Sequence, residues 1–227
     1  MRIALLLIII GIVIFGPQLW TRRVFAQHSA PRPDYPGTGA ELARHLLDQL
    51  DMTHIKVEMT EMGDHYDPET KTVRLTSDKF NGKSLTAVTV AAHEVGHALQ
   101  DHTGYAPFAE RTRLVRIAHK AEKVGGMVMM GIPIAAVVAQ TPVAGALVLV
   151  AGMATMGIST LVHLLTLPVE WDASFRCALP VLQQRNYLSP EDERGARRIL
   201  TAAALTYVAA SLASLLNLWR WIGFLRR

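Results

Sequence analysis

The stretch from Val124 to Val169 contains 46 residues without one Asp, Glu, Lys or Arg. A membrane-crossing helix needs about 20 consecutive apolar residues, and soluble domains rarely contain so long an uncharged stretch. A Gln-Thr-Pro break at 140–142 divides it, so we expect a two-helix membrane hairpin. With further apolar segments at 3–20 and 200–222, the sequence predicts a mainly α-helical, multi-pass protein of the cell membrane with about four transmembrane helices.

The remaining segments have the composition of a water-exposed domain. Residues 21–123 hold 14 Lys and Arg and 14 Asp and Glu. Apolar residues at helical spacing predict an amphipathic helix from Ala40 to Leu50, and two alternating segments, HIKVEMTE and KTVRLTS, predict a small β hairpin. The predicted organisation is an N-terminal membrane anchor at 3–20, a water-exposed domain at 21–123, the membrane hairpin at 124–169, a helix at 170–199 and a C-terminal membrane helix at 200–222.

The net charge of +4 does not indicate a nucleic-acid partner. The excess comes from Arg2, Arg220, Arg226 and Arg227, which lie beside apolar segments, and no basic stripe with interleaved aromatic residues occurs. Near the membrane segments, 13 Lys and Arg lie on the side of residues 21–123 and four on the other. This distribution predicts that the water-exposed domain is cytoplasmic.

The segment LTAVTVAAHEVGHALQDH, from Leu85 to His102, predicts a buried helix with His93, Glu94 and His97 in its middle. Burying such groups without partners is costly. Helical residues four apart share a face, so both imidazoles can reach one zinc ion. Glu94, one residue further round, can act as general base on a zinc-activated water, which is the arrangement of HExxH metalloproteases.

A catalytic zinc site needs a third protein ligand. Asp101 is eight residues from His93, about 12 Å along the helix axis, which one ion cannot span. Glu170 is the better candidate because it is the first charged residue after the long apolar stretch. If Glu170 meets the two histidines, that stretch must begin and end on one side of the membrane, as a hairpin would.

Two segments, NGKSLTAVTVAAHEVGHALQDHTGY (81–105) and LPVEWDAS (167–174), closely resemble the YugP-type family of bacterial membrane zinc peptidases. The resemblance covers nearly the whole chain and extends to HtpX-type membrane proteases. It implies a zincin-like catalytic domain of the gluzincin type. By this resemblance one zinc ion is bound by His93, His97 and Glu170, and Glu94 is the catalytic residue.

The resemblance also implies contacts around the metal. In such enzymes the strand before the active helix adds the substrate peptide as an extra strand, so Val73, Arg74 and Leu75 are expected to contact substrate. Many gluzincins carry an Asp four residues after the Glu ligand to orient a histidine. Ser174 stands there in this chain, so either Ser174 or Asp172 is expected to do this.

The sequence therefore predicts a zinc endopeptidase that acts on membrane or misfolded proteins at the cytoplasmic face. Its expected partners are a peptide or protein substrate and the lipid bilayer, with no nucleic acid, while an oligomer or a membrane partner protein stays open. Two alternatives remain: a zinc-bound scaffold without proteolytic activity, and a site-2-type protease whose HExxH helix lies in lipid. Candidates for the oxyanion donor are Arg176, His163, Tyr105 and His102.

Overall fold

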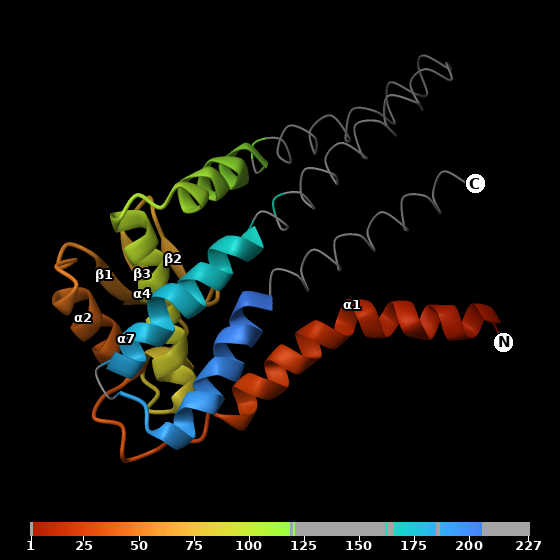
Figure 1. Cartoon of the computed structure of the whole chain (residues 1–227), viewed down its shortest axis with the longest axis horizontal. Helices are drawn as coiled ribbons and strands as arrows, with labels where there is room; N and C mark the ends of the chain where they lie inside the picture. Colours follow the sequence, from red (N-terminus) through yellow and green to blue (C-terminus); the bar gives the residue numbers. More distant parts are fainter. Residues whose placement is uncertain (1, 119, 121–161, 163–165, 185–186, 206–227) are drawn as a thin grey trace.

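The structure is a computed structural model, and it describes residues 2–118, 120, 162, 166–184 and 187–205 of the 227-residue chain (Figure 1). These residues are mostly helical, with one small sheet. Helix α4 (Leu85–His102) lies in the middle and carries the HExxH segment, so the other elements are best located by how they pack on it.

Helix α4 forms where the sequence predicts it, after the break at Asn81-Gly82. The Ser84 hydroxyl caps it by accepting a hydrogen bond from the Ala87 amide at 3.1 Å, which satisfies one of the unpaired donors of the first turn. Fifteen of its 18 residues are buried, so α4 is surrounded by protein on nearly every side. This environment is that of a core helix of the domain.

Helix α2 (Gly39–Gln49) covers one side of α4 and confirms the amphipathic helix predicted from Ala40 to Leu50. Thr38 and Glu41 form a capping box, in which each side chain accepts a hydrogen bond from the other's backbone amide. The buried face carries Leu46 and Leu47, which join the main hydrophobic core. Capping and amphipathicity together explain why this segment is helical.

The sheet differs from the predicted hairpin. Its strands are β1 (Lys56–Met59), β2 (His65–Asp67) and β3 (Thr72–Leu75), in the order β1-β3-β2. The two predicted strands pair in parallel, and β2, inside the predicted loop, pairs antiparallel with β3. A turn makes the β2–β3 reversal: the Asp67 carboxylate accepts from the Glu69 and Thr70 amides, and Lys71 adopts a positive φ of 51°.

After α4 the chain forms a helix over 106–118. It returns as a helix over 166–172, which runs directly into the π-helix η1 (Ala173–Ala178) and α7 (Leu179–Gln184). A last described helix spans 190–205. Figure 1 shows the helices of 166–184 and 190–205 passing α4 on the side away from the sheet. They bring C-terminal residues against the HExxH helix.

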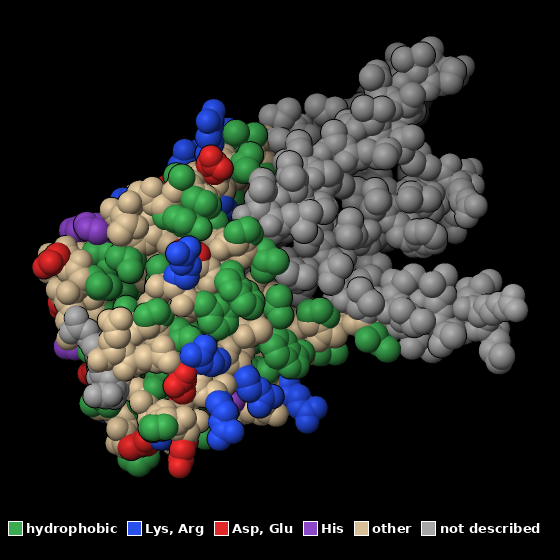
Figure 2. Space-filling model, viewed as in Figure 1, with side chains coloured by type: hydrophobic (Ala, Val, Ile, Leu, Met, Phe, Trp, Pro, Cys, Tyr) green, Lys and Arg blue, Asp and Glu red, His purple; other side chains and the backbone are tan. Residues whose placement is uncertain are grey.

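Helix α1 (Arg2–Gln27) starts in the predicted anchor but continues beyond it. Its last turns pack on the domain: Val24 is 1% exposed, and the Thr21 hydroxyl donates to the Ala202 carbonyl at 3.3 Å. Further toward the N-terminus the described apolar side chains Ile12, Phe15 and Leu19 are exposed. On the face in Figure 2, Lys and Arg side chains are interspersed with Asp and Glu.

The predicted fold class was wrong in its membrane part. Among the described residues no helix is both long and apolar enough to cross a membrane, so a domain fused to about four transmembrane helices is not supported. The anchor predicted at 3–20 is part of α1, which extends through Arg22 and Arg23 and ends packed on the domain. Most of 124–169 and 200–222 lies outside the described residues.

Candidate metal centre

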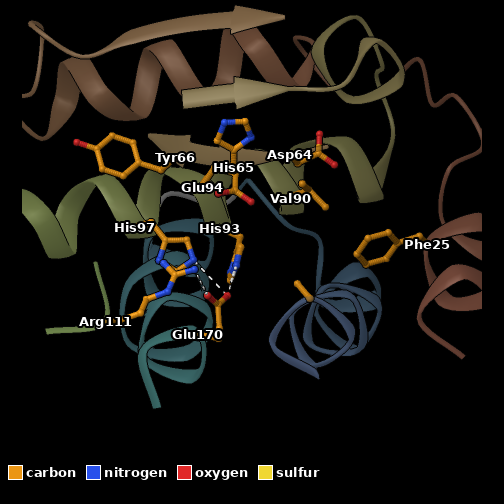
Figure 3. Close-up of a pocket in the computed structure, with 11 residues that line it drawn as sticks. Phe25, Asp64, His65, Tyr66, Val90, His93, Glu94, His97, Arg111 and Glu170 are labelled. Atoms are coloured by element: carbon orange, nitrogen blue, oxygen red, sulfur yellow. Dashed lines mark hydrogen bonds and ion pairs between the residues drawn. The ribbon is translucent and has the colours of Figure 1, made fainter. Parts of the chain in front are cut away.

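Three buried side chains meet between α4 and the helix over 166–172. The Nε2 atoms of His93 and His97 each lie 3.2 Å from Oε2 of Glu170. One ligand atom from each residue lies within 4.8 Å of the others, close enough to hold one metal ion. The three side chains are 4%, 5% and 1% exposed, and Figure 3 shows both rings directed at the carboxylate.

Gln100 fixes the orientation of the His97 ring. The Gln100 amide nitrogen donates to the Val169 carbonyl and to the Asp172 carboxylate, both at 2.9 Å. Both partners are pure acceptors, so the amide oxygen must face His97 and accept from Nδ1–H at 2.9 Å. In the neutral ring, Nε2 therefore carries the lone pair that faces Glu170.

Ser174 fixes the orientation of the His93 ring in the same way. Its hydroxyl donates to the Leu200 carbonyl at 3.3 Å and so accepts from Nδ1–H of His93 at 3.0 Å. Neutral His93 then also presents the Nε2 lone pair to Glu170. Of the two residues expected to orient a histidine, Ser174 contacts the ring directly, and Asp172 lies behind Gln100.

The hydrogen bonds of Gln100 and Ser174 to the Nδ1 atoms indicate whether the three residues suit a metal ion. Two imidazole lone pairs and a carboxylate oxygen repel one another unless both rings are doubly protonated or a cation lies among them. Two neutral imidazoles and one carboxylate are the ligand set of a catalytic zinc site. Outer partners that fix the tautomer are a regular feature of metal-binding histidines, so the residues present fit zinc.

Glu170 is held in its charged form. Burial alone would raise its pKa, but the positive charge of His97 and hydrogen bonds from His93 and His97, when Nε2 carries a proton, outweigh burial and hold the pKa well below its usual value. With both rings in the neutral tautomers described above, a bound cation would supply that positive charge instead. Its second oxygen, Oε1, lies 3.4 Å from the guanidinium of Arg111, on the helix over 106–118. A permanently charged carboxylate is the form that binds a cation.

The pKa of Glu94 is shifted in the opposite direction to that of Glu170. Burial raises its pKa to about 7, with His93 opposing this rise and the negative charges of Glu170 and Asp64 adding to it. Its side chain lines a cavity of about 250 Å³ that also borders His93, His97 and Glu170. A carboxyl group with a pKa near neutrality can accept and release a proton during one reaction cycle.

Gly96 lets the two halves of the site approach closely. A Cβ atom at this position would lie 2.7 Å from the carbonyl oxygen of Ala173, the first residue of η1. The absence of a side chain therefore brings η1 against α4 one residue before His97. The π-helix begins three residues after Glu170, and such segments often occur at functional sites.

Other predicted positions lie away from the metal group. Strand β3 is paired on both edges, so Val73, Arg74 and Leu75 have no free edge for a substrate strand, and Val73 and Leu75 are fully buried. The sheet order, which a parallel β1–β3 pair creates, makes β3 central and leaves no free edge on it within the described residues, while contact of these three residues with substrate stays a prediction. Asp101 accepts from Tyr66 and Lys71, tying the sheet to the end of α4.

The three predicted oxyanion candidates within the described residues do not line the cavity. The Arg176 side chain is 79% exposed and faces Asp172, while His102 ends α4 and Tyr105 follows it, both outside the cavity lining. His163 lies outside the described residues.

Sequence reasoning missed Gln100 and Arg111, and also His65 and Tyr66, which line the cavity from β2. Gln100 could have been noticed as a polar residue on the buried face of α4, three positions after His97. The others become neighbours of the metal group only through the tertiary fold.

Comparisons with known proteins agree with this chemistry. A family described as "Putative neutral zinc metallopeptidase" matches residues 3–226 of the chain. The chain is 33% identical over 225 residues to the "Putative membrane protease YugP" of Bacillus subtilis (strain 168), with 96% of each chain covered. No solved structure matches the chain.

Proposed function

Because the chain belongs to this family of zinc metallopeptidases, we propose that it is an endopeptidase in which His93, His97 and Glu170 bind the zinc ion and Glu94 is the general base. The observation that carries the proposal is the convergence of two orientated imidazoles and one charged carboxylate beside a second carboxyl group of raised pKa.

The chemistry is divided between the ion and the chain. Zinc held by His93, His97 and Glu170 would supply a Lewis acid for the scissile carbonyl and would lower the pKa of a bound water to about 7. Glu94 accepts the proton of the attacking water and then delivers it to the amine nitrogen that leaves. Burial raises the pKa of this carboxyl group in the metal-free site, which favours the uptake of a proton, and the charge of a bound cation would oppose that rise.

The edge strand β2 is the proposed place for the substrate backbone. Within the described residues β2 pairs only with β3, and its residues His65 and Tyr66 line the cavity. A peptide added along β2 by main-chain hydrogen bonds would pass above Glu94, which lies below His65 in Figure 3. This proposal places the substrate strand along β2 instead of β3.

We also propose that the enzyme works at a membrane, on membrane or misfolded proteins. The printed name of the Bacillus relative supports the membrane. The cytoplasmic face stays a prediction from the distribution of Lys and Arg.

The test is cleavage of an unfolded protein, such as casein, by the purified full-length chain. We expect activity that a chelator abolishes and zinc restores. Glu94→Gln should retain zinc and lose activity by at least about 100-fold, because a general base contributes about 10²–10⁴-fold. Glu61→Gln, an exposed Glu with the same change of side chain, is the control and should remain active.

The alternative of a zinc-bound scaffold predicts a different pattern. Wild type and Glu94→Gln would then bind zinc equally well and neither would cleave the substrate. Cleavage that survives Glu94→Gln would remove Glu94 from the mechanism while leaving the metal centre intact.

A further inference from the structure

The cavity over the metal group has an apolar side that the proposed chemistry does not use. Phe25 from α1, Val90 from α4 and Ala203 from the helix over 190–205 line it together with the catalytic residues. Figure 3 shows Phe25 and Val90 on one side of His93 and Glu94, and Arg111 on the other. One carboxylate, that of Asp64, lies beside Val90 on the same side, where it accepts hydrogen bonds from Thr76 and pairs with Lys79.

Hydrogen bonds between the three helices fix this apolar side. Thr86, in the first turn of α4, donates its hydroxyl to the Phe25 carbonyl at 2.9 Å and its amide to the His28 carbonyl at 3.1 Å. The bond from Thr21 to Ala202 joins α1 to the helix over 190–205, one residue before Ala203. Phe25 is therefore held at the cavity by bonds on both sides.

The size of the cavity limits what it can accept. About 250 Å³ is smaller than the roughly 300–1,000 Å³ of sites for drug-sized molecules. This volume suits one side chain and the adjoining peptide group. Phe25 and Val90 offer no polar partner, and the charged group beside them is the Asp64 carboxylate, so an acidic side chain would lose its water there without compensation.

We propose that Phe25, Val90 and Ala203 form a specificity pocket for an apolar, leucine-sized side chain of the substrate next to the bond that is cleaved. This inference rests on the proposed peptidase function and adds a substrate class to it. Helix α1 would thereby contribute directly to substrate selection.

The experiment uses peptides that differ only at the residues flanking the cleaved bond, with Ala, Leu, Phe, Asp or Lys there. Wild type should cleave the Leu peptide at least about tenfold better, by kcat/KM, than the Ala or Asp peptides, since one methylene in such a pocket changes discrimination by about 10–200-fold. Ala203→Leu fills the pocket and should reverse the preference toward Ala. Phe25→Ala enlarges it and should improve cleavage of the Phe peptide relative to Leu.

Matched controls lie on α1 outside the pocket. Phe15→Ala and Ala26→Leu make the same kinds of change at exposed positions and should leave the preference unchanged. Zinc content and thermal unfolding of every variant show whether it has folded. If Ala203→Leu does not fold, Phe25→Ala and Phe25→Trp still test the pocket in opposite directions.

A binding measurement separates this inference from the activity. In the zinc-loaded Glu94→Gln protein, fluorescence anisotropy should show that the Leu peptide binds about tenfold more tightly than the Asp peptide, and that adding Ala203→Leu removes this difference. If wild type cleaves peptides and the pocket variants keep its preference, the pocket is wrong and the peptidase function stands. If wild type cleaves no peptide and binds none, both proposals fail.

Discussion

The direction of the His97 ring depends on a single amide side chain. Gln100 is 1% exposed and joins the Nδ1–H of His97 to the Val169 carbonyl and the Asp172 carboxylate. In Gln100→Leu these groups lose their shared partner, and the ring is free to turn. Loss of such a partner costs about 10–100-fold in metal affinity, so we expect the zinc Kd to rise by that factor.

Competition with a chromophoric chelator measures this affinity. Gln183→Leu, the same change at an exposed position, should bind zinc like wild type. Wild-type affinity in Gln100→Leu would mean that packing alone orients His97.

The raised pKa of Glu94 makes the stability of the metal-free protein depend on pH. Its pKa is about 7 in the folded protein, against 4.5 for a glutamate side chain free in water. Between these values the folded protein holds a proton that the unfolded chain has released, so the free energy of unfolding falls as pH rises from 4.5 to 7. The whole fall is on the order of 3 kcal/mol, at about 1.36 kcal/mol per pKa unit.

Chemical unfolding of metal-free wild type and Glu94→Gln at a series of pH values isolates this contribution. The difference between the two proteins should change across this window and level off above pH 7. A difference that stays constant with pH would show that Glu94 ionises in the folded protein without a cost of burial.

At the scale of the elements, the contact between α4 and η1 depends on Gly96. A Cβ atom there would meet backbone, the Ala173 carbonyl oxygen at 2.7 Å, so Gly96→Ala must push the two elements apart. We expect a loss of about 1–3 kcal/mol in the free energy of unfolding, as for other overpacked sites. We also expect weaker zinc binding, because Glu170 lies three residues before η1 and would move with it.

Gly16→Ala provides the matched control within a helix. Among the described residues, a Cβ there meets only the flexible Ile12 side chain at 3.9 Å, and alanine favours helix, so stability should hold or rise slightly. Chemical unfolding and zinc titration of both variants test the prediction. Equal behaviour of the two would mean that α4 and η1 tolerate separation.

The elements differ in how well the sequence predicts them, and the reasons are physical. Helices α2 and α4 follow from local signals, namely apolar spacing and the capping residues Thr38 and Ser84. The sheet topology does not, because β2 has three residues and the parallel pairing of β1 with β3 joins distant segments. The π-helical turns of η1 leave no periodic signal, so Ser174 and Asp172 could not be separated beforehand.

In the whole molecule, too, the site residues fixed by one helix can be predicted from the sequence, and those brought together by tertiary packing cannot. His93, Glu94 and His97 can be found from sequence because one helix fixes their spacing. Glu170 could be chosen only by its place after the apolar stretch, and Phe25 and Arg111 reach the cavity through tertiary packing alone. Apolar composition also led to the membrane-helix prediction, which the described residues do not support. Hydrophobicity indicates that a segment is shielded from water, and lipid or other parts of the protein can provide the shielding.

A metal ion bound by residues from distant segments should stabilise the folded protein, because it links those segments. Glu170 is 77 residues from His93 and 73 from His97, so a ligand that binds all three joins segments that separate on unfolding. A ligand that binds only the folded state stabilises it by about 2.7 kcal/mol at 100 times its Kd. Zinc should therefore raise the midpoint of thermal unfolding of the full chain, and a chelator should lower it.

Two variants show whether zinc stabilises the protein through Glu170 or through binding at some other place. Glu170→Gln removes a charged ligand and should lose most of the zinc-dependent shift. Glu94→Gln changes a neighbouring buried carboxyl group that is not a proposed ligand and should keep the shift. An equal shift in both variants would place the ion elsewhere, because Glu170 is the residue of the helix over 166–172 whose carboxylate contacts both imidazoles directly.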